Sequence, residues 1–161
     1  MSKLRIVTII AVWYTFSTSF PMSEANAQVK STDNPTAIAT AFYEKSTRLW
    51  NEEGKTDSNP SMYTEDADLI NAFGPHWHGR DEIAAHTYAV VSSARPTLSY
   101  RLISAKMIAP DMVLAIAIGI TNVPNGQPRA GQNELSQTVL LVKQGSEWKV
   151  RFFQSTPVVN R

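Results

Sequence analysis

The second half of the chain alternates apolar and polar positions with the two-residue period of a β-strand. Over residues 98–102, Leu, Tyr and Leu alternate with Ser and Arg, which places successive side chains on opposite faces of a sheet. Three further strands are predicted at 112–121, 135–143 and 148–155, separated by short stretches that contain Pro, Asn, Gly or Ser. Short connections of this kind favour antiparallel neighbours.

The first half has the longer period of helices. Asn34 followed by Pro35 is a typical helix start, and the apolar spacing that follows predicts a helix ending near residues 50–51. The same Asn-Pro pair at 59–60 predicts a short helical turn, and residues 81–93 predict a second long helix.

Two shorter strands are predicted before that second helix, at 68–73 and 76–78, with Gly74-Pro75 between them. Helices therefore gather in the first half of the chain and long strands in the second. This order is typical of an α+β domain and not of a parallel α/β sheet.

The first 27 residues are expected to be a cleaved signal peptide. Residues 1–5 hold two positive charges, residues 6–20 are uncharged and mostly apolar, and Ala25-Asn26-Ala27 has the small-x-small pattern of a cleavage site. A membrane anchor is the alternative, but spanning needs about 20 apolar residues, and Ser and Thr interrupt this run. We expect cleavage after Ala27, export to the periplasm or beyond, and one domain at 28–161.

Charge and cysteine content exclude several functions. Without residues 1–27 the chain has 13 basic and 13 acidic side chains and no cluster of either, so neither nucleic acid nor an anionic membrane is an expected partner. The chain has no cysteine, which excludes disulfides, thiolate metal sites and cysteine nucleophiles.

Four stretches of the chain form a pattern that is known from a protein family. They are Leu49-Trp50-Asn51, the run Tyr63 to Asp68, the run Asn71 to Gly74 with Trp77 and Gly79-Arg80, and the run Phe153 to Val158, together with Ile83 and His86. The pattern resembles the SgcJ/EcaC group of SnoaL-like proteins. The resemblance implies the nuclear transport factor 2-like fold, in which a cone-shaped, strongly curved antiparallel sheet wraps around N-terminal helices (a cystatin-like α+β roll).

The resemblance also implies a ligand pocket inside the cone. Asn71 and Trp77 match pocket-side positions of the family, and Gln154 does so on the last strand, so that Arg151, with the opposite strand parity, would face outward. Strand alternation would turn Phe73 inward with Asn71. We include Tyr63 in the same pocket, and ordinary core packing is the alternative for all of these residues.

His86 and Asp68 are the candidate catalytic residues. On the predicted helix His86 shares a face with Ile83, and a histidine titrates near neutral pH, which suits a general acid or base. The ketosteroid isomerases share the fold that the resemblance implies. In them, a carboxylate in the region that corresponds to Asp68 transfers a proton next to a carbonyl group. The alternatives are a hydrogen-bonded core histidine and a solvated strand start, and Asp66 shares the strand parity of Asp68.

His76 and His78 raise the question of a metal. Alternate strand positions place two imidazoles on one face, which zinc or copper could use. No thiolate is present and no acidic ligand is assured, so we expect no metal. Nucleotide, flavin and phosphate-loop motifs are absent from the sequence, and no cofactor is expected.

Two functions remain open. One is an exported domain that binds a small, largely apolar molecule, with or without cofactor-independent proton transfer of the isomerase, dehydratase or cyclase type. The other is a non-catalytic exported ligand-binding or dimerisation domain. Residues 112–120 are apolar on both strand faces, which predicts burial on both sides and a homodimer through the open face of the sheet.

Overall fold

The computed structural model describes residues 33–51, 60–94, 96–122 and 133–158. The elements follow one another as α1 (Pro35–Asn51), η2 (Pro60–Met62), β1 (Tyr63–Ile70), β2 (His76–His78), α2 (Arg80–Ala94), β3 (Thr97–Ala109), β4 (Met112–Asn122), β5 (Glu134–Gln144) and β6 (Glu147–Pro157). The predicted signal peptide lies outside the described residues. Within the described ranges, no helix has the length and apolar character needed to cross a membrane.

Helix α1 begins where the sequence predicted. The Asn34 side-chain oxygen accepts hydrogen bonds from the backbone N–H groups of Thr36, at 3.0 Å, and Ala37, at 3.4 Å. Asn34 therefore caps the helix, and Pro35 takes the first helical position, where its missing N–H has no partner to lose.

The six strands form one curved sheet in the order β2-β1-β6-β5-β4-β3. All neighbours are antiparallel except β1 and β6, which are parallel, so the sheet is mixed and the prediction of a fully antiparallel sheet was wrong on this pair. Short connections determine only the strands they join, whereas α2 and the four strands β2 to β5 separate β1 from β6 along the chain.

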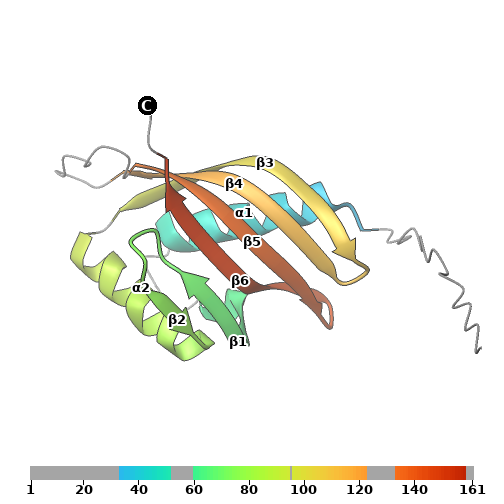
Figure 1. Ribbon diagram of the computed structural model, residues 1–161, viewed down its shortest axis with the longest axis horizontal. Coiled ribbons are helices and arrows are strands. Elements are labelled where there is room, and N and C mark those ends of the chain that lie inside the picture. Colours follow the sequence, from blue (N-terminus) through green and yellow to red (C-terminus); the bar gives the residue numbers. More distant parts are fainter. Residues whose placement is uncertain (1–32, 52–59, 95, 123–132, 159–161) are drawn as a thin grey trace, which may run out of the picture.

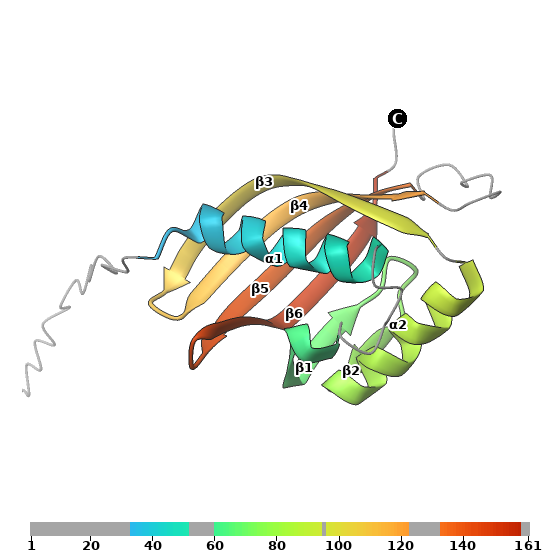
Figure 2. The same cartoon turned by 180° about the vertical axis from the view of Figure 1, so that it is seen from behind.

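Helix α1 lies across the inner, concave face of β3 to β6, and α2 lies beside β1 and β2 (Figures 1 and 2). Under α1, a buried cluster joins Phe42 and Leu49 to Val139 and Leu141 of β5. A smaller cluster joins Ala67 and Leu69 of β1 to Ile83 of α2. Small side chains on β4, at Ala115 and Ala117, are fully buried and leave room for the helix.

The carboxyl end of α1 is fixed to the start of β3. The Trp50 indole N–H donates to the Pro96 carbonyl at 2.7 Å. The Asn51 side chain accepts from the Leu98 N–H at 2.8 Å and donates to the Leu98 carbonyl at 2.7 Å. These three bonds set the position of the helix over the edge strand.

On the outer face of the sheet, the side chains of β4 are apolar and no described element covers them. In β4 the inner positions are buried, while Ile116 on the outer side is 37 % exposed. Two register shifts in β3 skip Ile103 and Ile108, and each of these isoleucines is 52 % exposed. The sequence predicted that both faces of β4 are buried. Within this chain the inner face of β4 is buried, and the outer face is not fully covered.

Candidate functional site

The structure does not bring the two candidate catalytic residues together. Asp68 pairs with His78 across β1 and β2, whereas Leu69 pairs with Trp77. Neighbouring positions in a strand point to opposite faces, so Asp68 lies on the outer face. Leu69 and Trp77 lie on the side of α2, where the His86 ring stacks on Trp77 with 4.4 Å between ring centroids.

Asp68 belongs to a cluster on the outer face that we call the carboxylate cluster, formed with Asp66, His76, His78 and Arg151. One carboxylate oxygen of Asp68 is 2.9 Å from His76 Nε2 and 2.9 Å from His78 Nδ1, and the other accepts from Arg151 at 2.9 Å. Hydrogen bonds from His78, Arg151 and His76 hold the pKa of Asp68 well below its usual range. A carboxylate held in this way is a poor general base.

Although the carboxylate cluster contains two histidines and two aspartates, it does not form a metal site. No group of three His, Asp or Glu side chains within the described ranges has a geometry that could hold a metal ion. The imidazoles instead converge on one carboxylate oxygen.

His86 is exposed on α2, whereas Ile83, three residues earlier, is 1 % exposed. The indole of Trp77 lies flat against the imidazole, with 9° between the two planes, and packs against the cluster around Ile83. His86 therefore lies at the edge of the buried face of α2, and the prediction that it shares the buried face of Ile83 was only partly correct.

Asn71 lies in a turn and not in the strand that the sequence predicted at 68–73. The observed strand β1 runs from Tyr63 to Ile70 and ends just before Asn71. Its side-chain oxygen accepts from the Phe73 N–H at 3.0 Å, and its carbonyl accepts from the Gly74 N–H at 2.9 Å. Gly74 has a φ of 100°, which other residues rarely adopt. Strand alternation therefore does not apply beyond Ile70, and Phe73 is 67 % exposed.

A β-bulge changes the expected direction of Arg151 and Gln154. Leu141 pairs with Val150 and Leu140 with Phe152, so Arg151 is skipped. Val150 is buried on the inner face, and Arg151 reaches the outer-face Asp68. Phe153 packs against the inner core, which places Gln154 on the outer face as well. The sequence predicted that Gln154 faces inward and Arg151 outward. Arg151 does face outward, whereas Gln154 does not face inward, because the prediction assumed unbroken alternation.

Tyr63 is partly buried and contacts both core clusters. Burial raises the pKa of its phenol above the usual value. Of the predicted pocket residues, Tyr63 and Trp77 thus lie at the inner clusters, whereas Gln154 faces outward and Asn71 and Phe73 form the β1–β2 turn.

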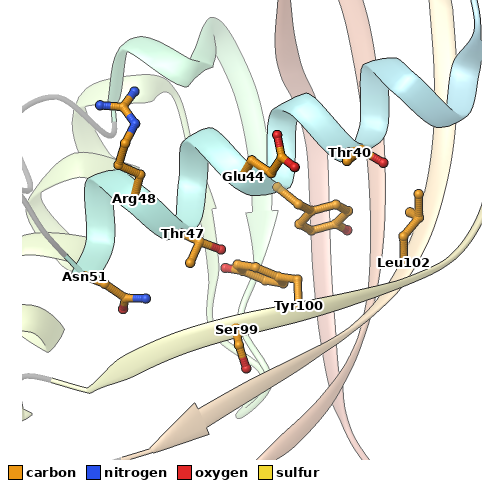
Figure 3. A pocket seen from close by; sticks show the side chains of 9 residues that line it. Thr40, Glu44, Thr47, Arg48, Asn51, Ser99, Tyr100 and Leu102 are labelled. Carbon is orange, nitrogen blue, oxygen red and sulfur yellow. The ribbon is translucent and has the colours of Figure 1, made fainter.

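The described cavity lies elsewhere, between α1 and the edge strand β3 (Figure 3), and we call it the cleft. Its volume is about 490 Å³, within the range of small-molecule sites. Its lining consists of Thr40, Tyr43, Glu44, Thr47, Arg48 and Asn51 from α1, and Ser99, Tyr100 and Leu102 from β3.

A polar network lies behind the cleft. The Tyr100 hydroxyl, removed from water, hydrogen bonds with Ser46 of α1 and Gln137 of β5, and the lost hydration raises its pKa. Gln137, only 4 % exposed, reaches Tyr100 across Gly119, where a β-carbon would lie 2.6 Å from the Gln137 amide nitrogen. Glycine at this position therefore gives the amide its room.

Tyr43 packs beside this network, its ring centroid 4.7 Å from that of Tyr100. Its hydroxyl is buried and has no hydrogen-bond partner among the described residues. Burial raises the pKa of the phenol, so the group stays protonated and can act only as a neutral donor or acceptor.

The sequence carried a signal for this network. Gln137 has the strand parity of the buried Val139 and Leu141, and a polar residue at a core position is an informative exception. The pairing of Gln137 with Tyr100 was not predictable, because it depends on the order of strands.

Comparisons with known proteins identify the fold. The chain matches no protein-family model, and no curated protein matches it in sequence. Solved structures do match. The chain has the nuclear transport factor 2-like fold, also called cystatin-like.

Three structures illustrate the likeness. An uncharacterised protein with a cystatin-like fold from Caulobacter vibrioides is 25 % identical, with a TM-score of 0.67 over 77 % of this chain and 89 % of that one. A nuclear transport factor 2-like protein of unknown function from Shewanella oneidensis is 19 % identical, with a TM-score of 0.65 over 76 % and 99 %. A protein from Novosphingobium aromaticivorans assigned as a scytalone dehydratase is 12 % identical, with a TM-score of 0.61 over 77 % and 84 %. The fold resemblance is thus confirmed, and it assigns no activity.

The two tyrosines at the cleft should respond differently to loss of the hydroxyl. We expect Tyr100→Phe to lower the free energy of unfolding by about 1–2 kcal/mol, because the hydrogen-bonding groups of Ser46 and Gln137 lose their partner. Tyr43→Phe should leave it unchanged or raise it by up to about 1 kcal/mol, because its hydroxyl has no such partner. Urea denaturation measures both values, and equal destabilisation by the two changes would contradict this description of the network.

Asp68→Asn should reveal a pH-dependent contribution to stability. The pKa of Asp68 is lower in the folded protein, so its ionised form stabilises the fold fully above the unfolded pKa of about 4 and progressively less below it. We expect wild type to exceed Asp68→Asn by about 1 kcal/mol at pH 5, and this difference to shrink by pH 3. Asp111→Asn, in the β3–β4 turn, is the control for a charge change elsewhere, and a difference independent of pH would refute the assignment.

Proposed function

We propose that the chain is an exported domain that binds a small, largely apolar molecule in the cleft between α1 and β3. The observation that carries the proposal is the cleft itself, whose volume of about 490 Å³ suits a ligand of two or three rings. Tyr43, Tyr100 and Leu102 offer apolar surface, and hydroxyls of Thr40 and Thr47 stand beside it. In Figure 3 the Thr47 side chain of α1 points toward Tyr100 of β3.

Binding is better supported than catalysis. His86 and Asp68 lie on opposite sides of the β1–β2 pair, and neither lines the cleft. The tyrosines at the cleft have raised pKa values, so they are hydrogen-bonding groups and not bases at neutral pH. The second candidate function is proton-transfer catalysis, because one structural neighbour is assigned as a dehydratase. Export rests on the pattern of residues 1–27.

The cleft is tested with 1-tetralone, a neutral bicyclic ketone, by ligand-observed NMR. We expect binding to the wild type and its loss in Thr47→Phe, because the larger ring would fill the cleft. Ala41→Phe places the same bulk on an exposed position of α1 outside the lining and should bind normally. The proposal would be refuted if 1-tetralone did not bind the wild type, or if Thr47→Phe and Ala41→Phe bound it equally well.

We also propose that two copies of the chain pair through the outer face of the sheet. Ile103, Ile108 and Ile116 expose a third to a half of their surface there, and burying exposed apolar area is the main source of stability in such interfaces. The equal numbers of acidic and basic side chains in residues 28–161 create little net repulsion between copies.

Light scattering during size-exclusion chromatography should give twice the chain mass for the wild type and a single chain mass for Ile116→Lys. Thr36→Lys, which adds the same charge at an exposed position of α1, should remain dimeric. A monomeric wild type would rule out the pairing.

A further inference from the structure

Among the described residues, the backbone of β3 has hydrogen-bonding groups that no neighbouring strand pairs. β3 is the last strand of the described sheet, so alternate residues turn their N–H and C=O away from β4. The Thr121 N–H donates toward β5, to Asn133, and Thr121 faces Leu98. The pair Leu98–Thr121 is therefore of the non-hydrogen-bonded kind, and Leu98 directs its backbone groups to the sheet edge.

One edge residue of β3, Leu98, already binds a carboxamide group of the protein. The carboxamide of Asn51 accepts from the Leu98 N–H and donates to the Leu98 carbonyl, at 2.8 Å and 2.7 Å. A planar group that carries a carbonyl oxygen and an adjacent N–H thus satisfies one edge residue of β3 completely.

The next edge residues lie inside the cleft. Tyr100 and Leu102 follow Leu98 at intervals of two and face Gly119 and Ala117, so they direct their N–H and C=O groups to the same edge. Both residues line the cleft. The bulge at Ile103 interrupts the regular edge beyond Leu102, so the open stretch is short and is bounded by Asn51 at its other end.

The charge of the lining restricts the ligand further. Glu44 and Arg48 are the only charged residues of the lining, and they lie four positions apart on α1, a separation at which opposite charges are neighbours. The lining therefore has no net charge, which favours a neutral ligand over a carboxylate or an amine.

We infer that the ligand is a neutral cyclic amide, whose N–H and C=O pair with the backbone of Tyr100 or Leu102 as the Asn51 carboxamide pairs with Leu98. This inference rests on the proposed function and names the class of ligand. A cis lactam presents its donor and acceptor on one edge, in the arrangement of the Asn51 side chain. Its hydrocarbon part then lies against the rings of Tyr43 and Tyr100.

The test compares 3,4-dihydro-2(1H)-quinolinone, an aromatic lactam, with its N-methyl derivative, which has lost the donor. Dissociation constants come from NMR titration of the ¹⁵N-labelled protein. We expect the lactam to bind about 5- to 10-fold more tightly, as one hydrogen bond is worth about 1 kcal/mol. The backbone amide signals of Tyr100 or Leu102 should shift with the lactam, and Thr47→Phe should abolish binding of both compounds while Ala41→Phe retains it.

The outcomes separate the two proposals. If both compounds bind equally and Thr47→Phe abolishes both, the cleft function stands and the amide inference is overturned. If 1-tetralone binds and neither lactam does, the amide inference alone is overturned, and if none of the three compounds binds, both proposals fail. Acetyl-alanine N-methylamide supplies the same groups from an extended peptide, and tighter binding of it than of the lactam would assign the edge to a polypeptide and overturn the small-molecule inference.

Discussion

The packing of α1 on the concave face of the sheet is the constraint on which the rest of the structure depends. Four long strands expose an apolar inner face that must be removed from water. Fully buried alanines on β4 let the helix approach, and Trp50 and Asn51 fix its end to the edge strand. The cleft lies between this helix and β3, on the side of the edge strand.

Bulges decide which side chains reach which face. One at Arg151 brings a guanidinium to the outer-face carboxylate of Asp68, and the two in β3 expose isoleucines. Each inserts one residue and reverses the alternation that follows. The carboxylate cluster and the exposed isoleucines of β3 are therefore consequences of register, and neither belongs to the inner core.

The interior keeps polar groups where an apolar core would be more stable. Gln137 and Tyr43 are almost fully buried, yet an oxygen of each has no partner among the described residues. Such groups carry a free-energy cost, and sites of this kind are where function is commonly found. Their place beside the cleft is consistent with ligand binding.

The sequence by itself determined the element types and the α+β class, because apolar period and capping residues are local properties, whereas the fold followed from its resemblance to a known family. Asn34 shows this at α1, and the alternation around Tyr100 shows it at β3. Only the tertiary structure decided the parallel pairing of β1 with β6, the outward turn of Gln154 and the separation of His86 from Asp68. Strand order and bulges couple residues far apart in the chain, and a local pattern contains no information about such couplings.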